Sequence, residues 1–419
     1  MNVMGSSPRA TVGASNAGQR HAWKAQMIRP LSDAGVGTRQ PFLRKTFQAK
    51  AGGRAVLRIS ALGLYRAFIN GKRVGDDLLT PGWTSYYDRL SYQTYDVGPL
   101  LADGDNVIDI WLGDGWYRSQ MMWAHEHALF NTWGDRIAAI AEIEANGRTI
   151  LATDASWSSG LTPVLKSGIY FGETYDARLE DAAADQDSVQ HEDFDPSVLV
   201  AHEVNGVKEL DLLRPVSSFS DTEGRTIYDF GQNAAAYVAL TVAGEAGATV
   251  LIEHSEILDK GEFCNTNLRS APCLVTYVLK GKGQESYRPI FTFQGFRFAR
   301  VTVTGKAEIV DIASVPISSA VTRTGWLTTG HPLVNRLVEN SVWSQRSNFV
   351  DVPTDCPQRD ERLGWTGDAQ VFAATACYLH DSHDFFIKWL RDVMADQREG
   401  GEIAHVVPDP TRGHEDLYV

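Results

Sequence analysis

The chain has 419 residues, of which 43% are hydrophobic and 22% charged, and its formal net charge is −13. This length supports several domains with buried cores, and the composition is that of an ordinary globular protein. The negative charge argues against nucleic acid or an anionic membrane surface as a partner and is compatible with neutral ligands.

The first forty residues, 1–40, are predicted to form a flexible or loosely attached N-terminal arm, with Trp23 and Met27 as candidate points of attachment. Residues 1–21 are rich in Ser, Gly, Ala and Arg and lack the apolar core, at least about seven residues long, of a secretory signal. No later stretch approaches the roughly 18 consecutive apolar residues of a membrane span. The cysteines lack metal-binding spacing: Cys264, Cys273, Cys356 and Cys377. Free thiols are the favoured interpretation, with a Cys264–Cys273 bridge as the alternative. We therefore expect a cytoplasmic protein without a membrane partner.

Residues 41–213 carry the pattern of a first β-domain. Apolar and polar residues alternate in short runs, which predict strands at 55–62, 65–69, 90–97, 106–112, 138–145 and 148–153. Asn70-Gly71 and Asn146-Gly147 predict tight hairpin turns. Residues 157–213 are predicted to be irregular, with the acidic run 180–187 as a solvated loop. Short strands with Gly-rich turns favour an antiparallel β-sandwich or jelly roll.

A second β-sandwich is predicted over residues 214–322. Its clearest strands are expected at 237–242, 249–254, 274–279 and 298–303. The segment Gly231-Gln232-Asn233 lies ahead of the first of these strands. Its two amide side chains are able to bind hydroxyl groups, but a turn and an edge contact are the favoured interpretation.

After Trp326 the apolar residues recur at helical spacing. Three helices are expected, around residues 333–342, 371–379 and 385–394, each with a wide apolar face. The segment 351–368 lies between the first two and contains five carboxylates, two arginines, one tryptophan and two prolines. Pro353 and Pro357 stiffen the backbone of this loop, and Gly364 and Gly367 permit sharp bends. We take this loop as the candidate active site.

Acids beside an indole on a stiff loop are typical of a site that cleaves sugars. We predict that Glu361 is the proton donor, because Trp365 supplies an apolar wall and neighbouring carboxylates also favour the protonated form. Asp355, Arg359 and Asp368 complete the set. In the structural alternative, Asp368 begins a helix and Arg359 and Arg362 are ion-pair partners.

No cofactor is expected, because phosphate-binding loops, dinucleotide fingerprints and the HExxH and GxSxG motifs are absent from the sequence. His125 and His127 flank Glu126, but no further ligands stand at suitable spacing. We therefore expect no metal site.

Residues 355–368, with the sequence DCPQRDERLGWTGD, resemble the catalytic signature of the bacterial-type α-L-rhamnosidases of glycoside hydrolase family 78. Residues 63–75, 229–233 and 291–297 are similar to segments of that family's β-sandwich modules. The resemblance covers roughly residues 23 to 408 and implies β-sandwich domains ahead of an (α/α)6 barrel, with residues 323–419 as an incomplete barrel. It also implies an inverting hydrolase that releases terminal α-L-rhamnose from rhamnose-containing glycosides.

By this resemblance Glu361 is the general acid, and Asp355, Arg359, Trp365 and Asp368 hold the rhamnose. Inversion requires a second carboxylate about 6.5–9.5 Å from the acid. In the family that base is a glutamate far downstream, so we expect it beyond Val419 and expect this chain to be a truncated form without activity. We also expect self-association through an exposed apolar surface that includes Phe385, Phe386, Trp389 and Leu390.

Two other functions are compatible with parts of this pattern. The two sandwiches alone would suit a carbohydrate-binding or scaffold protein without chemistry of its own. The loop would also suit another (α/α)6 glycosidase that acts on a different sugar. The intact Glu361 loop favours the enzyme, because a pure binding module has no need of a proton donor.

Overall fold

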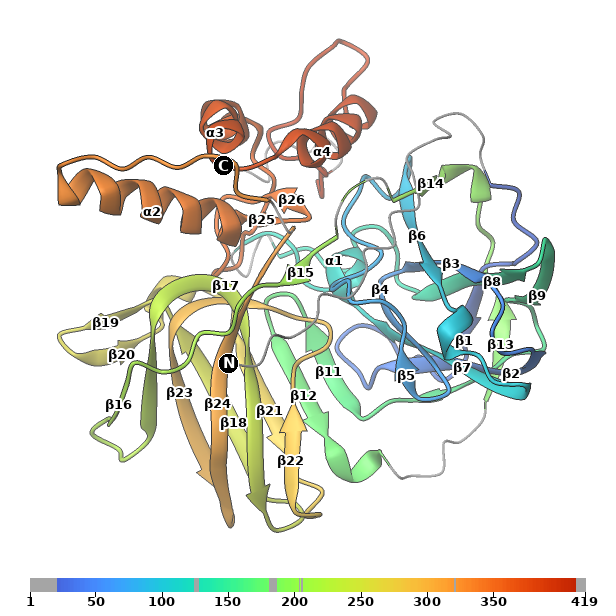
Figure 1. The fold of residues 1–419 in the computed structure, drawn as a ribbon, viewed down its shortest axis with the longest axis horizontal. Coiled ribbons are helices and arrows are strands. Elements are labelled where there is room, and N and C mark those ends of the chain that lie inside the picture. Colours follow the sequence, from blue (N-terminus) through green and yellow to red (C-terminus); the bar gives the residue numbers. More distant parts are fainter. Residues whose placement is uncertain are drawn as a thin grey trace.

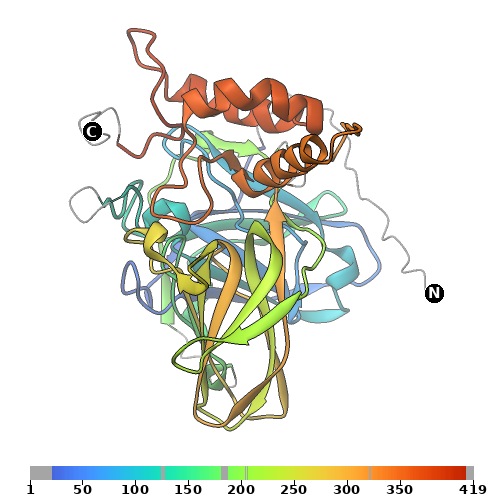
Figure 2. The ribbon, with the colours of Figure 1, turned by 90° about the vertical axis from the view of Figure 1, so that its left-hand side faces the viewer.

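We describe a computed structural model of the chain, which covers residues 21–123, 128–180, 187–202, 204, 206–319 and 322–411. Two large β-sheets precede a group of helices, and the helices lie together at one end of the molecule, above the sheets (Figures 1 and 2). The coarse expectation of β-domains followed by a helical region is therefore confirmed. Four free cysteines are found, as expected.

The first sheet has 12 strands and is mainly antiparallel. In spatial order its path runs β14 (Leu199–Ala201), β6 (Leu90–Asp96), β3 (Ala55–Leu62), β8 (Ala138–Ala145), β1 (Ile28–Pro30), β13 (Asp187–His191), β10 (Ser158–Leu161), β2 (Pro41–Ala49), β7 (Gly104–Gly113), β4 (Leu64–Ile69) and β5 (Lys72–Arg73), with β9 (Arg148–Ala152) paired to β8. Alternate residues of β3 and β7 are buried, and Leu57, Ile59, Ile108 and Ile110 meet in one core. The predicted alternation therefore describes a sandwich-like packing of the two halves of this sheet.

Both predicted hairpin turns are confirmed. Asn70 and Gly71 have φ angles of 52° and 74°, and Asn146 and Gly147 have φ angles of 52° and 73°. Asn and Gly tolerate this left-handed region better than other residues, which explains the type of turn. The turns join β4 to β5 and β8 to β9.

The second sheet has 10 strands. Its path runs β11 (Val164–Gly168), β12 (Gly172–Asp176), β21 (Leu274–Val278), β18 (Thr249–Ser255), β23 (Gln294–Thr304), β17 (Thr226–Gly244), β24 (Ala307–Ser318) and β15 (Lys208–Glu209), with β16 (Ser217–Ser220) and β22 (Gln284–Tyr287) paired to β17. Two small hairpins are formed by β19 (Ile257–Asp259) with β20 (Glu262–Cys264), and by β25 (Phe349–Val350) with β26 (Val352–Pro353).

Two expectations for the first β-domain are wrong. Residues 157–213 were expected to be irregular, but they contain six strands, β10 to β15, within the described residues. Of these, β11, β12 and β15 belong to the second sheet, so the chain crosses between the sheets before residue 213. The strands were missed because they are short and lack regular alternation.

The N-terminal arm is the other correction. Residues 1–20 lie outside the described residues. Met27 is buried, as a point of attachment would be, and Ile28 is buried as well. Strand β1 pairs with both β13 and β8. Residues 28–30 are therefore part of the first sheet, because pairing and burial offset the entropy cost of fixing a short segment.

Four α-helices occur in the described residues: α1 (Gly115–Arg118), α2 (Pro332–Asn348), α3 (Thr366–Leu379) and α4 (His383–Ala395). The last three confirm the helices predicted from apolar spacing. Phe349, which follows α2, stacks on Phe385 of α4, with ring centroids 4.2 Å apart and an interplanar angle of 8°. None of the described helices is long and apolar enough to cross a membrane.

The apolar surface of the helices differs from the expected one. Phe385 and Trp389 were expected to belong to a surface that is not buried as a whole, but each of the two is only 5% exposed. Phe385 packs on Phe349, and the indole N–H of Trp389 donates to the carbonyl of Val407 at 3.0 Å. Leu390 is exposed, as expected, and the other exposed apolar side chains of these helices are Leu333, Val334, Leu337, Val371, Tyr378, Ile387 and Met394. Self-association through them stays a prediction.

Candidate active site

The candidate site is the loop that joins α2 to α3. The loop starts at a tight β25–β26 hairpin, in which Asp351 has a φ of 68°. It ends where Trp365 forms the N-terminal boundary of α3. A later segment holds this end, since the N–H of Val407 donates to the carbonyl of Gly364 at 2.9 Å. The loop is therefore held at both ends by backbone hydrogen bonds.

Arg362 anchors the middle of the loop to the second β-domain. Its side chain is 1% exposed. One terminal nitrogen donates to the carbonyls of Ile169 and Phe293 at 2.9 and 2.8 Å, and the other donates to Gln294 Oε1 and the carbonyl of Gln358 at 3.0 Å each. In the structural alternative Arg362 was an ion-pair partner, but these contacts are with carbonyl and amide oxygens. Its planar fork of donors suits this role.

The start of the loop is fixed by buried charges. Lys388 Nζ of α4 lies 2.8 Å from Asp351 Oδ2 and 3.0 Å from the Asp351 carbonyl, and it also donates to the carbonyl of Trp83. Both charged side chains are 3% exposed. Trp83 lies in the loop between β5 and β6 of the first sheet. The first sheet, α4 and the candidate loop therefore meet at this point.

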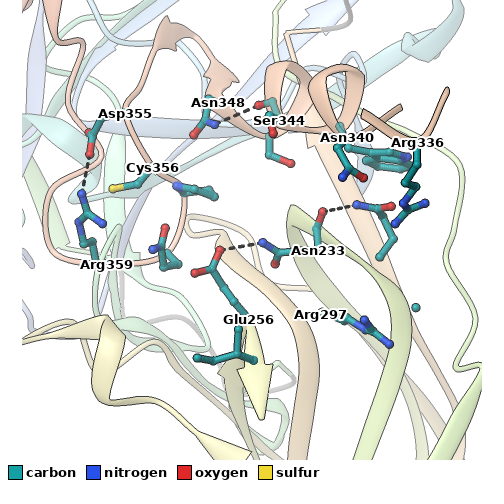
Figure 3. A pocket seen from close by; sticks show the side chains of 17 residues that line it. Asn233, Glu256, Arg297, Arg336, Asn340, Ser344, Asn348, Asp355, Cys356 and Arg359 are labelled. Atoms are coloured by element: carbon teal, nitrogen blue, oxygen red, sulfur yellow. Dashed lines mark hydrogen bonds and ion pairs between the residues drawn. The ribbon is translucent and has the colours of Figure 1, made fainter. Parts of the chain in front are cut away.

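Asp355 and Arg359 form an ion pair within the loop, with Nη2 3.3 Å from Asp355 Oδ2 (Figure 3). The other oxygen of Asp355 accepts from the backbone N–H of Leu363 at 2.8 Å. Burial raises the pKa of Asp355 to about 6, and the negative charge of Glu361 acts in the same direction.

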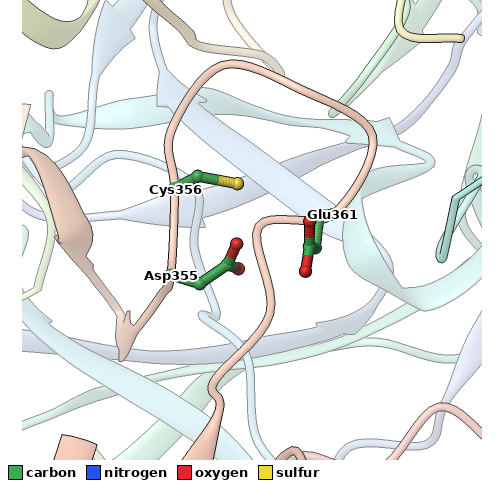
Figure 4. A group of neighbouring side chains, drawn as sticks. All are labelled: Asp355, Cys356 and Glu361. Carbon is green, nitrogen blue, oxygen red and sulfur yellow. The ribbon is translucent and has the colours of Figure 1, made fainter. Parts of the chain in front are cut away.

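Glu361 stands opposite Asp355, and their carboxyl groups approach each other across the loop (Figure 4). Glu361 Oε2 lies 2.7 Å from Arg359 Nε and 3.1 Å from Arg269 Nη1. The indole N–H of Trp365 donates to Glu361 Oε1 at 3.2 Å. The side chain of Glu361 is 12% exposed. Trp365 therefore meets Glu361 with the polar N–H edge of its indole.

The structure thus links four of the five predicted site residues by direct contacts: Asp355, Arg359, Glu361 and Trp365. Asp368 lies in the first turn of α3 and is exposed. That position suits the helix-start interpretation and also leaves the carboxylate available to a ligand.

Sequence reasoning missed two further residues of the site. Arg269 comes from the segment between β20 and β21, 92 residues before Glu361. Trp123 comes from the segment between α1 and β8, and its ring stacks on Trp365 with centroids 6.2 Å apart. Nothing in their local sequence distinguishes them from other surface residues, so only the fold identifies them.

A metal ion is a poor fit to this cluster. One donor atom each from Asp355, Cys356 and Glu361 lies within 4.8 Å of the others. However, Arg359 already contacts both carboxylates and repels a cation. Burial and the neighbouring Asp355 raise the pKa of the Cys356 thiol, and a protonated thiol is a weak ligand. His125, Glu126 and His127 lie outside the described residues.

Asp355 is expected to make the stability of the protein depend on pH. Its pKa is raised from 3.8 to about 6, so between these values the folded state binds the proton more tightly than the unfolded state. Asp355 therefore contributes fully to the free energy of unfolding below about pH 4, and this contribution, about 3 kcal/mol, is lost as the pH rises to about 6.

Asp355→Asn retains an acceptor for the N–H of Leu363 and should remove this dependence of the free energy of unfolding on pH. Urea unfolding of both proteins at several pH values between 4 and 7 measures it, and parallel curves would show that Asp355 does not titrate there.

Three family models match consecutive parts of the chain. Residues 50–214 match the α-L-rhamnosidase N-terminal domain, and residues 220–321 match the bacterial α-L-rhamnosidase concanavalin-like domain. Residues 322–417 match the bacterial α-L-rhamnosidase 6 hairpin glycosidase domain. The candidate loop lies in this third match.

Proteins with the name α-L-rhamnosidase are similar over most of the chain. One from Streptomyces avermitilis is 38% identical over 370 residues, which cover 85% of this chain and 36% of the relative. One from Formosa agariphila is 33% identical over 413 residues, which cover 92% of this chain and 44% of the relative. The chain thus spans less than half the length of these relatives.

Solved structures show the same relationship. The α-L-rhamnosidase of Aspergillus terreus has a TM-score of 0.87 at 33% identity, over 93% of this chain and 47% of that one. The Streptomyces avermitilis enzyme, solved as a complex with L-rhamnose, has a TM-score of 0.84 at 38% identity, over 89% of this chain and 38% of that one.

Proposed function

The chain belongs to the bacterial α-L-rhamnosidase family, glycoside hydrolase family 78, and we propose that it carries the acid half of a site that hydrolyses terminal α-L-rhamnosides. The observation that supports this most is the cluster of Glu361 with Arg359, Trp365 and Asp355 on a firmly anchored loop. Glu361 protonates the leaving oxygen. Asp355, Arg359, Trp365 and Asp368 bind the rhamnose.

We propose an inverting mechanism, in which a second carboxylate activates water on the opposite face of the sugar. That carboxylate stands about 6.5–9.5 Å from the acid in inverting enzymes. An oxygen of Asp355 lies within 4.8 Å of one of Glu361, which leaves no room for a water and a sugar between them. The base is therefore a different carboxylate, outside this cluster, and Asp355 is a binding residue.

The proposal extends to the architecture of the helical region. Helices α2, α3 and α4 supply opening members of an (α/α)6 barrel, with domain boundaries near residues 213 and 322. The exposed apolar positions on these helices suit burial against further helices. The boundary near residue 213 does not separate the two sheets completely, because strands β11, β12 and β15 precede it but belong to the second sheet.

Hydrolysis is tested with the whole protein and an aryl α-L-rhamnoside, with proton NMR of the first product formed. We expect β-L-rhamnose to appear first and to equilibrate afterwards with the α-anomer. Initial α-L-rhamnose would contradict inversion. No hydrolysis together with retained rhamnose binding would support the carbohydrate-binding alternative.

Asp368 provides a test of recognition that is separate from catalysis. Because it is exposed in the first turn of α3, Asp368→Asn should leave stability almost unchanged. It should weaken binding of L-rhamnose by about 1.5–3 kcal/mol, since a charged acceptor is lost. Asp384→Asn, which changes an exposed aspartate in the first turn of α4, is the control and should bind normally in calorimetry. Equal affinity of both variants would assign Asp368 to the helix start alone.

A further inference from the structure

A pocket of about 640 Å³ lies beside the candidate site, between the second sheet and α2 (Figure 3). Arg359 and Asp355 line it on one side, while Glu361, Trp365 and Asp368 are not among its lining residues. Arg359 also contacts Glu361. The pocket is therefore separate from the proton donor but shares a side chain with it.

The wall from the second sheet is built by a bulge in β17. Between Asp229 and Ala234, β17 advances five positions while the paired β23 advances only two. The extra residues carry Gln232 and Asn233 to the pocket. Gly231 permits the bend, with a φ of 75°. A bulge of this kind costs ladder hydrogen bonds, and such features commonly direct side chains toward sites.

The bulge is held in place by paired charges and amides. Asp229 accepts from the N–H of Gly231 at 2.7 Å and forms a two-pronged pair with Arg297, at 2.7 Å for each bond. Asn233 Nδ2 donates to Glu256 Oε1 at 2.8 Å, and Asn267 Nδ2 donates to the other oxygen at 3.1 Å. The wall is thus preorganised, with the charges of Arg297 and Glu256 largely satisfied.

The opposite wall is one face of α2. Its residues recur at helical spacing: Arg336, Asn340, Trp343, Ser344 and Ser347. A helix usually packs on a sheet through apolar residues. Here Arg336 and Asn340 of α2 are exposed, and Trp343 is half-buried. This mainly polar face of α2 borders the pocket. Packing of α2 on the sheet does not require these residue types.

We propose that this pocket is a second carbohydrate-binding site, which takes a neutral saccharide unit of the substrate beside the site of Glu361. Amide groups donate and accept hydrogen bonds as sugar hydroxyls do. Trp343 adds an aromatic ring to the lining, and the Arg346 guanidinium lies over that ring, 5.2 Å from its centroid. The volume lies within the roughly 300–1,000 Å³ typical of small-molecule sites. Only the class of the substrate, a rhamnoside whose second sugar enters the pocket, rests on the proposed function.

The test compares a monosaccharide with a disaccharide by calorimetry on the full chain. The probes are methyl α-L-rhamnoside and a rhamnosyl-glucose disaccharide. The double variant Gln232→Ala/Asn340→Ala should bind the disaccharide about tenfold more weakly than the parent protein and bind the methyl rhamnoside equally well. Gln370→Ala, which removes an exposed amide from α3, is the matched control and should change neither affinity.

Saturation-transfer NMR gives a second measurement that does not depend on affinity. The glucose protons should receive saturation in the parent protein and lose most of it in the double variant. Equal disaccharide affinity and equal saturation in the two proteins would overturn the pocket proposal, as would the absence of disaccharide binding to the parent.

These outcomes are distinguishable from a failure of the proposed function. If Asp368→Asn leaves methyl rhamnoside binding intact while the double variant weakens the disaccharide, the pocket stands and Asp368 has no part in recognition. If Asp368→Asn weakens both probes and the double variant weakens neither, the proposed function stands without the pocket.

Discussion

Replacement of Glu361 by glutamine is expected to slow hydrolysis of rhamnosides with poor leaving groups by about 10²- to 10⁴-fold, the usual contribution of a general acid. Glutamine has nearly the same shape and can still accept a hydrogen bond from Trp365, but it carries no transferable proton. Substrates with good leaving groups, such as nitrophenyl rhamnosides, should lose much less because their departure needs little protonation. The measurement is kcat in the whole protein for a series of leaving groups.

The controls separate the acid from its neighbours. Glu308→Gln changes an exposed glutamate on β24 and should leave kcat unchanged for every substrate. Asp355→Asn should raise KM for all leaving groups alike, as expected for a binding residue. If leaving-group dependence appears in Asp355→Asn and not in Glu361→Gln, then Asp355, the carboxyl whose pKa is raised to about 6, is the proton donor.

The sequence predicted those residues of the site that lie close together along the chain. Asp355, Arg359, Glu361 and Trp365 lie within eleven consecutive residues, 355–365, of one stiff loop, so their proximity followed from the chain itself. Arg269 and Trp123 reach the same site from other elements, and their places depend on how the two sheets pack against each other. No local pattern records such contacts.

The elements of the fold also divide into those that local sequence specifies and those that depend on partners far away in the chain. Hairpins with Asn-Gly turns were predictable, because backbone conformation at the turn specifies the pairing. Strand β1 was not, since its three residues become a strand only when β13 and β8 lie on both sides of it. Burial of Phe385 and Trp389 also depended on distant partners, namely Phe349 and Val407. The Lys388–Asp351 pair belongs to this class, since no spacing rule relates the two residues.

Replacement of Lys388 by methionine is expected to lower the free energy of unfolding by about 3–5 kcal/mol, because it leaves the buried carboxylate of Asp351 without its cation. Asp351 loses its partner at 2.8 Å. Burial already raises the pKa of Asp392, and Lys388 and Arg89 oppose that shift. Lys306→Met, which breaks the exposed pair with Glu245, should cost no more than about 1 kcal/mol. Urea unfolding of the three proteins measures the difference.

Lys388→Met should weaken rhamnose binding as well as stability, because Asp351 is the first residue of the loop that carries Glu361. Rhamnose affinity of Lys388→Met should fall even at temperatures where the protein stays folded. The double variant Lys388→Met/Asp351→Asn removes the uncompensated charge, and asparagine tolerates the positive φ of position 351. It should therefore recover much of the stability. If the double variant is no more stable than Lys388→Met, then the lysine acts through its hydrogen bonds to the carbonyls of Trp83 and Asp351 and not through its pairing with the Asp351 carboxylate.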